Sequence, residues 1–372
     1  MTDYINHPDI LVEELKNGWW AVRLNRPKSL HALDEQIVVA LHSIFEYLHT
    51  NDAVKAVWFD STTPKAFCAG GDVRKLRQLV INEEVEQAKS FFHHEYALDR
   101  LLHHYVKPVV VWGEGYVMGG GLGLFMAAPF RLATPHSRLA MPEINIGLYP
   151  DVGATRFLAD RGAIGLFIGM TGSIMTAAGA YSIGWATHVC EQGRENVLGR
   201  LTHIRWQDYP AGDYRAIEDT LNSLHRPLAA GPLQDSLDVI HSVCRGSDFM
   251  QDVQAIKGLA TARSDWLRQA SENLSNGSPT TAAITWLLWQ WAKQHRSWDD
   301  VFTLEEEISA WKIQHADFIE GVRARLVDKD LQPDWQVQDY QNIRDLFPNV
   351  VPRSAQIDSW NALLRQYGIL SD

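Results

Sequence analysis

Two carboxylates that lie close together in the sequence are the first residues that suggest chemistry. Glu143 lies in AMPEIN and Asp151 in LYPDVG, and each directly follows a proline. Apolar residues surround Glu143, and such surroundings desolvate a carboxylate and raise its affinity for a proton. A carboxyl group of this kind can act as a general acid or base. The alternative role for Asp151 is a helix cap, because a helix is predicted to begin near Val152.

Two glycine-bearing loops precede these carboxylates. The triplet from Gly119 to Gly121 follows an apolar strand pattern and opens a predicted helix, and AFCAGGD places Gly70 and Gly71 after another strand. Glycines at a helix N-terminus leave backbone N–H groups uncovered, where the helix dipole favours negative charge. Two such loops can direct two donors at one carbonyl oxygen, as an oxyanion hole requires. The structural alternative is that the three glycines are needed because the backbone there adopts unusual dihedral angles or packs closely against a neighbouring segment.

Other ligand-binding motifs are poorly matched. The glycine spacing departs from G-x-G-x-x-G, the acidic residue of a dinucleotide-binding fold is missing, and no G-x-x-x-x-G-K-[ST] loop is present. The sequence also lacks H-E-x-x-H, so we interpret its paired histidines as polar groups on a helix surface rather than as metal ligands. These are His93, His94, His103 and His104. We therefore expect no metal and no cofactor.

Composition narrows the class of protein further. The chain has 372 residues, of which 46% are hydrophobic and 21% charged, which is typical of a folded globular protein. A net charge of -11 without a long basic run argues against nucleic acid as the main partner. The sparse cysteines Cys68, Cys190 and Cys244 indicate reduced thiols. The N-terminal segment does not resemble a signal or transit peptide, and no apolar run is long enough to span a bilayer. We therefore expect a cytoplasmic protein without a membrane partner.

The first half of the sequence alternates strand patterns with amphipathic helix patterns. Strands are predicted over 19–24, 54–60 and 107–113, and helices follow a cap at Asp34 and extend over 82–104. This alternation predicts an α/β fold.

Beyond about residue 205 the pattern becomes mostly helical. The apolar segment 281–292 is predicted to be a packed helix, with Pro279 near its first turn. We therefore predict a catalytic core over 1–205 and a mostly helical C-terminal region over 206–372.

Taken together, the motifs resemble those of the crotonase superfamily, the enoyl-CoA hydratases and isomerases. The resemblance rests on AFCAGGD, GYVMGGGLGL and AMPEINIGLYPDVGA, and it extends to LNRPKSLHAL, FFHHEYALD and SPTT. DFIEGVRARLVDKDLQPDW resembles the branch that hydrolyses 3-hydroxyisobutyryl-CoA. The resemblance implies a spiral of ββα units, with the helical C-terminal region packed against it, and acyl-CoA thioesters as substrates.

The resemblance also implies roles for individual residues. Gly71 and Gly120 correspond to the oxyanion-hole donors, and Glu143 and Asp151 to the catalytic acid pair. Glu95 corresponds to a residue that helps to bind the substrate hydroxyl.

A loop near the N-terminus corresponds to one that lines the CoA channel. Arg26 and Lys28 are candidates to contact CoA phosphates, and solvated loop charges are the alternative. His31 stands where many relatives have Asn, a change that would alter coenzyme contacts without abolishing them.

Gly123 distinguishes between the activities of the superfamily. Enoyl-CoA hydratases carry one of two catalytic glutamates at this position, and glycine cannot supply a carboxylate. We therefore expect hydrolysis of a short 3-hydroxyacyl-CoA, with 3-hydroxyisobutyryl-CoA and valine catabolism implied by the resemblance. The alternatives are an enoyl-CoA hydratase or isomerase of the same fold and a non-catalytic acyl-CoA-binding protein. A homo-oligomer is left open, because a C-terminal extension can fill the surface that crotonase relatives use to assemble.

Overall fold

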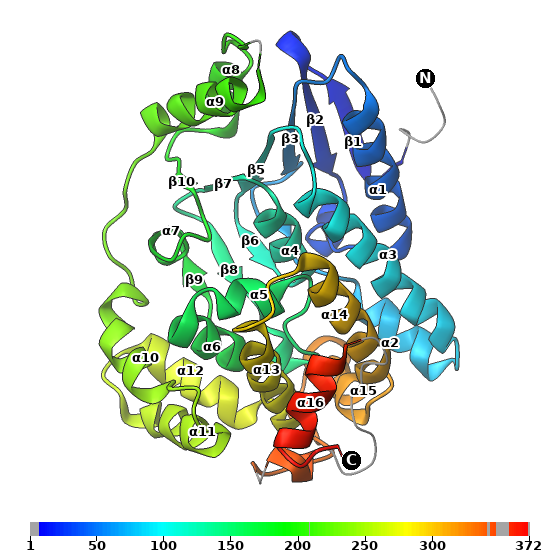
Figure 1. Ribbon diagram of the computed structural model, residues 1–372, viewed down its shortest axis with the longest axis vertical. Coiled ribbons are helices and arrows are strands. Elements are labelled where there is room, and N and C mark those ends of the chain that lie inside the picture. The colour runs from blue at the N-terminus through cyan, green and yellow to red at the C-terminus, as the bar shows by residue number, and fades with distance from the viewer. Residues whose placement is uncertain (1–6, 208, 341–342, 347–356, 371–372) are drawn as a thin grey trace. The chain divides into compact units, whose positions relative to one another are not determined.

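The computed structural model describes residues 7–207, 209–340, 343–346 and 357–370 (Figure 1). The chain divides into two compact units, and each unit is built from three separate segments of sequence. The first unit comprises Met1–Gly71, Ala97–Leu139 and Met175–Gln234, and the second comprises Asp72–Tyr96, Ala140–Ile174 and Asp235–Asp372. The two units therefore alternate along the sequence. The predicted division at residue 205 follows a change in composition and stays a prediction.

A six-stranded sheet forms the centre of the first unit, in the order β1-β2-β3-β5-β7-β10. Its strands are β1 (Ile10–Glu14), β2 (Trp19–Leu24), β3 (Ala56–Ser61), β5 (Val109–Gly113), β7 (Phe130–Ala133) and β10 (His188–Val189). β1 and β2 are antiparallel, and the other neighbours are parallel. Trp19 pairs with Ala56, and Val57 pairs with Val109. Apolar runs such as VVVWG suit parallel strands because both faces of such a sheet are covered.

A smaller sheet in the same unit has the order β4-β6-β8-β9. It contains β4 (Ala66–Cys68), β6 (Tyr116–Met118), β8 (Arg138–Ala140) and β9 (Met175–Thr176). The helices of this unit are α1 (Glu35–Thr50), α4 (Gly120–Ala127), α7 (Ala177–Ser182), α8 (Arg194–Leu201) and α9 (Pro210–Leu224), with short 3-10 turns at Lys16–Gly18 and Pro27–Ser29. The predicted cap of α1 is confirmed, because the Asp34 carboxylate accepts a hydrogen bond from the Ile37 N–H at 3.1 Å.

Helices α8 and α9 pack their apolar side chains against one face of the six-stranded sheet. The cluster contains buried residues from β2, β3, β5 and β7 together with six side chains from the two helices, which are Val197, Leu198, Leu201, Ile217, Leu221 and Leu224. Burial of these side chains stabilises the unit by about 25 cal/mol for each Å² of apolar surface removed from water.

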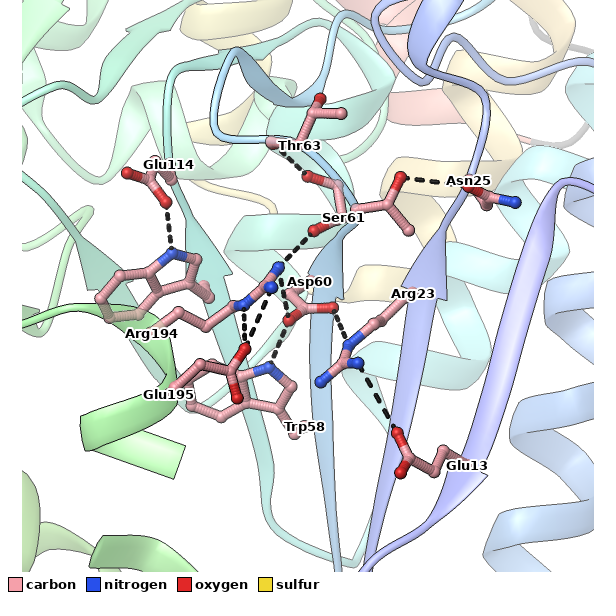
Figure 2. A network of polar contacts seen from close by, with 12 residues as sticks. Glu13, Arg23, Asn25, Trp58, Asp60, Ser61, Thr63, Glu114, Arg194 and Glu195 are labelled. Carbon is pink, nitrogen blue, oxygen red and sulfur yellow. Dashed lines mark hydrogen bonds and ion pairs between the residues drawn. The ribbon is translucent and has the colours of Figure 1, made fainter. Parts of the chain in front are cut away.

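A buried carboxylate joins the start of α8 to this sheet. Figure 2 shows Asp60 of β3 between Arg23 of β2 and Arg194 of α8, at 3.1 and 3.5 Å. The Trp58 Nε1–H also donates to Asp60 at 2.7 Å, and Arg194 donates to the Ser61 carbonyl at 2.8 Å. Burial raises the pKa of Asp60 to about 6, and these donors and charges oppose the rise. The two arginines thus compensate a carboxylate that would be costly to bury alone.

The second unit is helical. It contains α2 (Val73–Ile81), the first part of α3 (Val85–His103), α5 (Ala154–Ala159), α6 (Gly162–Thr171), α10 (Leu237–Val243), α11 (Phe249–Lys257), α12 (Asp265–Asn276), α13 (Pro279–Ala292), α14 (Trp298–Lys312), α15 (Ala316–Val322) and α16 (Asp358–Gln366). Short turns occur at Glu143–Asn145, Gln234–Ser236, Gly258–Thr261, Arg323–Val327 and Ile343–Leu346. Helix α13 is buried over almost its whole length, and the Ser278 hydroxyl caps it by accepting from the Thr281 N–H at 3.1 Å.

The sequence-based expectations for secondary structure are largely confirmed. The strands predicted over 19–24, 54–60 and 107–113 are β2, β3 and β5, and the apolar helix predicted over 281–292 is α13. The α/β class is confirmed as well. Among the described residues, no helix is both long and apolar enough to cross a membrane.

Candidate active site

The triple glycine opens α4 in the first unit. Gly119 has a positive φ of 51°, and its carbonyl accepts from the N–H groups of Leu122 and Gly123 at 2.8 and 3.1 Å. These are the first hydrogen bonds of the helix, so the N–H groups of Gly120 and Gly121 lie ahead of them. The predicted role of Gly120 needs such an N–H at the start of the helix. Gly123 is buried within α4 and presents no carboxylate.

The second glycine loop lies next to the first. Gly70 has a φ of +95°, and a Cβ atom built on it would lie 3.1 Å from the Met118 carbonyl oxygen and 3.4 Å from the Gly120 nitrogen. Gly71 forms an isolated parallel bridge with Leu33, in which the Leu33 N–H donates to the Gly70 carbonyl at 2.9 Å. This hydrogen bond does not use the Gly71 N–H. The structure therefore brings together the two loops that carry the predicted oxyanion donors.

Replacing Gly121 by alanine is expected to disturb both loops. The added Cβ would lie 2.4 Å from the backbone oxygen of Cys68, and a backbone atom cannot yield as a flexible side chain can. We expect a loss of about 1–3 kcal/mol of stability. If the adjacent Gly120 N–H holds an oxyanion, its displacement should also lower the turnover by about 10²–10³. Thermal unfolding and thiol release from an acyl-CoA would measure the two effects.

Gly199→Ala is the matched control, because a Cβ at this position in α8 meets nothing within 4 Å. We expect unchanged turnover and equal or slightly higher stability. Equal behaviour of the two variants would contradict the close packing of Gly121 on Cys68.

The loop that carries Arg26, Lys28 and His31 is held by its histidine. The buried His31 has a φ of 59°, and its Nδ1 accepts from the Arg26 N–H at 3.0 Å. The neutral ring therefore carries its hydrogen on Nε2, which lies 2.9 Å from Thr63 Oγ1. Burial lowers the pKa of His31, which favours this neutral form. The Arg26 guanidinium donates to the Ala32 carbonyl at 3.1 Å, and Lys28 is exposed. Contacts with CoA stay predictions for Arg26 and Lys28.

The predicted acid pair lies in the second unit. Glu143 begins a 3-10 turn directly after Pro142, and its side chain is buried. Within the described residues, Glu143 Oε2 has no hydrogen-bond partner. Burial raises the pKa of Glu143 well above its ordinary value, and the charge of Asp151 raises it further. A carboxyl group in this environment can hold a proton at neutral pH, which is unusual for glutamic acid.

Asp151 does not cap a helix. Helix α5 begins at Ala154 after Gly153, which has a φ of 85° and gives no side-chain cap. The Asp151 carboxylate instead accepts a hydrogen bond from the Tyr96 hydroxyl at 2.7 Å. Burial raises the pKa of Asp151 to about 6, and the Tyr96 hydrogen bond opposes the rise. The helix-cap alternative for Asp151 is therefore wrong.

A distant glutamate caps α5 in its place. Both oxygens of the buried Glu305, from α14, accept backbone hydrogen bonds, from the Gly153 N–H at 2.7 Å and the Thr155 N–H at 3.1 Å. Burial raises the pKa of Glu305 to about 8, and hydrogen bonds from Thr155 and Gly153 oppose this. Glu305 thereby fixes the turn that directly follows Asp151. The sequence did not predict this role of Glu305, because LEEEIS has the pattern of an ordinary helix. Nothing in it indicates a hydrogen-bond partner 150 residues away.

We expect Glu305→Ala to loosen the turn that carries Asp151. The substitution leaves two buried N–H donors without an acceptor and should cost about 1–3 kcal/mol of stability. The turnover should fall as well, because Asp151 loses its fixed position. The control is Glu306→Ala, whose carboxylate makes only a partly exposed contact with His93 at 2.8 Å. Equal melting temperatures for the two variants would contradict the capping role.

Segments from the C-terminal part of the chain hold the backbone around the acid pair. The Ser278 N–H donates to the Ile144 carbonyl at 3.0 Å, and the Thr281 hydroxyl donates to the Leu148 carbonyl. A Cβ on Gly321 would lie 2.4 Å from the carbonyl carbon of Ile146. The segments SPTT and DFIEGVRARLVDKDLQPDW therefore pack against the part of the chain that connects Glu143 to Asp151.

The remaining predicted residues are placed as follows. Glu95 is buried on α3, next to Tyr96, and belongs to the same unit as the acid pair. His93 is exposed, and His94 approaches Ser90 Oγ at 3.4 Å. The part of the chain that the structure describes contains no group of three or more side chains able to hold a metal ion.

Comparison with known proteins identifies a family. The family model described as enoyl-CoA hydratase/isomerase matches residues 20–348. A 3-hydroxyisobutyryl-CoA hydrolase from Gallus gallus, named as mitochondrial, is 31% identical to this chain. The alignment covers 91% of this chain and 87% of the hydrolase. The small ribosomal subunit protein mS47 of Neurospora crassa is 30% identical over 86% of this chain and 66% of its own.

A solved structure supports the same relationship. The crystal structure of a carnitinyl-CoA dehydratase from Mycobacterium thermoresistibile has a TM-score of 0.79 and 26% sequence identity. The alignment covers 94% of this chain and 99% of the dehydratase. The neighbouring structure thus has the same fold over nearly the whole chain.

The expectation of a cytoplasmic protein is wrong by these comparisons. Similar hydrolases from chicken, zebrafish and human are all named as mitochondrial. That expectation rested on an N-terminal segment without the pattern of a signal or transit peptide and on the lack of a long apolar run, and these features do not decide the location.

Proposed function

Because this chain belongs to the enoyl-CoA hydratase/isomerase family, we propose that it hydrolyses the thioester of a short 3-hydroxyacyl-CoA. The first candidate substrate is 3-hydroxyisobutyryl-CoA, which the similarity to hydrolases of that name supports. One observation carries the proposal: the buried pair Glu143 and Asp151 is present, whereas Gly123 leaves the hydratase position without a carboxylate. Such a site can exchange protons with water and a leaving group, but it lacks the second glutamate of a hydratase.

The proposed reaction breaks the carbon–sulfur bond of the thioester. A water oxygen attacks the carbonyl carbon, and the carbonyl oxygen becomes an oxyanion that the Gly71 and Gly120 N–H groups would stabilise. Glu143 either takes the proton of this water or attacks the carbonyl itself to give an anhydride that water then opens. Collapse of the intermediate releases the CoA thiolate, which needs a proton.

The raised pKa values of the acid pair suit these reaction steps. Burial raises the pKa of both carboxyl groups, and the charge of Asp151 raises the pKa of Glu143 further. Two interacting carboxyls lose their protons in separate steps, so the pair holds a single proton over an intermediate pH range. A singly protonated pair offers one base and one acid at the same time. No cofactor is needed for the reaction, and Glu95 would bind the substrate hydroxyl.

Release of a thiol distinguishes this proposal from hydration. The purified protein would be given 3-hydroxyisobutyryl-CoA, the same acyl chain without its hydroxyl, and crotonyl-CoA, with free thiol and enoyl absorbance followed separately. We expect thiol release that is fastest with the hydroxylated substrate. Hydration of crotonyl-CoA without thiol release from any substrate would refute the proposal. Oxygen-18 entering Glu143 in a single turnover would favour the anhydride route over the general base.

A non-catalytic role is the second candidate, and the similarity to a protein named as a ribosomal subunit component favours it. The net charge of -11 argues against direct contact with RNA, so such a role would rest on protein partners. Absence of turnover on every acyl-CoA, together with sedimentation with ribosomal subunits, would support this candidate.

A further inference from the structure

Three buried hydroxyl groups form a continuous chain that begins at Asp151. Tyr96 Oη lies 2.7 Å from Asp151 Oδ2 and 2.6 Å from Ser309 Oγ. Ser309 Oγ lies 2.9 Å from Tyr149 Oη, and the Tyr149 hydroxyl donates to the backbone carbonyl of Glu305 at 2.7 Å. Residues from α3, α14 and the loop before α5 contribute to it, and all are buried. The chain thus has four contacts and ends on a group that can only accept.

Counting hydrogens shows that the chain is complete in only one state of Asp151. Each hydroxyl carries one hydrogen, so Tyr96, Ser309 and Tyr149 together supply three. Four contacts need four hydrogens, and the Glu305 backbone carbonyl supplies none. The fourth hydrogen can come only from Asp151. When Asp151 is protonated, each group donates to the next along the whole chain.

Ionisation of Asp151 removes one of the four hydrogens. Tyr96 then donates to the carboxylate, and the single hydrogen of Ser309 can serve either Tyr96 or Tyr149, but not both. One of the short oxygen–oxygen contacts is left without a hydrogen. In a buried site this is costly, because a polar group that is removed from solvent and loses its hydrogen-bond partner carries the cost of its desolvation.

We propose that Tyr96, Ser309 and Tyr149 are positioning residues that set the pH at which Asp151 releases its proton. Ser309 and Tyr149 favour the protonated carboxyl group, whereas the Tyr96 hydroxyl, which donates to the carboxylate, favours the ionised form. The catalytic meaning of this proton rests on the proposed function, in which Asp151 exchanges a proton with water or with the leaving thiolate. The hydrogen count itself does not depend on the substrate. On release, the Asp151 O–H bond breaks, the electron pair stays on the carboxylate, and Tyr96 turns its hydrogen toward it.

Burial acts on the titratable groups around the chain. Burial is the main cause that raises the pKa of Asp151, and the negative charge of Asp151 in turn raises the pKa of Glu143. Burial raises the pKa of Tyr96 well above its ordinary value, and the neighbouring Asp151 raises it further, so the tyrosine keeps its hydrogen. The titratable groups that act on Tyr96 are Asp151, Tyr149, Glu305 and Glu95, whereas α14 also carries the buried Lys312, whose ion-pair partner is Asp317 at 3.9 Å.

The substitutions that test this proposal have opposite expected effects. Ser309→Ala removes the middle of the chain, so the hydrogens of Tyr96 and Tyr149 then satisfy the two remaining contacts with Asp151 ionised. We expect the ionisation of Asp151 to move down by about one pH unit. Tyr149→Phe should shift it in the same direction, since Ser309 is then free to donate to Tyr96. Tyr96→Phe removes the donor to the carboxylate and should shift the ionisation up.

The measurement is a direct titration of the Asp151 carboxyl. Infrared difference spectra against Asp151→Asn would follow its protonation in each variant. In parallel, the hydrolysis rate would be measured as a function of pH, to find the pH at which the rate falls on the acid side (the acid limb). Ser271→Ala is the control, because Ser271 is a buried serine that donates to the Lys257 carbonyl at 2.8 Å, away from the chain. We expect no shift for this control.

The possible outcomes separate the two proposals. Opposite shifts in the titration without any hydrolysis would support the hydroxyl chain and overturn the proposed function. Hydrolysis whose acid limb is unchanged in all three variants, with no shift in the titration, would overturn the chain. Shifts of Ser309→Ala and Tyr96→Phe in the same direction would also overturn it. If Tyr96→Phe does not fold, a downward shift in Ser309→Ala and Tyr149→Phe still decides the question.

Discussion

Replacing Glu143 by glutamine is expected to lower thioester hydrolysis by about 10²–10⁴, the usual contribution of a positioned acid or base. The amide has nearly the shape of the carboxyl group but can neither take a proton from water nor attack the thioester. Glu143 is buried and carries a raised pKa, so the substitution removes a group whose charged form is costly. We therefore expect the variant to fold and to be at least as stable as the original.

The rate of thiol release and the melting temperature would be measured on the same preparation. Glu46→Gln serves as the control, because Glu46 is an exposed residue of α1 whose carboxylate lies 3.5 Å from His42 Nδ1 on the same helix. The control should retain full activity. Unchanged hydrolysis in Glu143→Gln would exclude Glu143 from the chemistry, whatever the control shows.

The second large effect is expected at Asp151. Hydrolysis should increase with pH through about 6, where the first proton leaves the acid pair, and decrease at higher pH, where the second proton leaves. Asp151→Asn should lower the rate by about 10²–10⁴ and remove one of the two limbs. The profile of kcat/KM against pH would be measured for both proteins. A wild-type rate that stays constant from pH 5 to 9 would contradict the paired assignment.

The same substitution has an opposite effect on stability. The pKa of Asp151 is raised to about 6 in the folded protein, whereas an unfolded aspartate ionises near 4. The contribution of this group to stability is therefore fully present below about pH 4 and is lost as the pH rises through 6. Above pH 6, Asp151→Asn removes the buried charge, and we expect a gain of about 1–3 kcal/mol. Below pH 4 the gain should disappear, which thermal unfolding at two pH values would show.

Local features could be predicted from the sequence because their causes are local. Short apolar runs identified β2, β3 and β5, and the position of Asp34 before a helical pattern predicted it as the cap of α1. Gly120 could be placed at a helix start for the same reason. The helix-cap alternative for Asp151 was wrong because the same short-range rule could not show that Tyr96 binds its carboxylate.

The sequence by itself determined the α/β class and the two glycine loops. Glu143 and Asp151 stay predictions as the catalytic pair, and the resemblance to the family singled out Gly123 as a position without the glutamate of a hydratase. Only the tertiary structure showed that Glu305 caps the helix after Asp151, and that Tyr96, Ser309 and Tyr149 connect this acid to a buried carbonyl. The physical reason is distance along the chain. Propensity and periodicity act over a few residues, whereas these hydrogen bonds join groups up to 213 residues apart, and only folding brings such groups within hydrogen-bond distance.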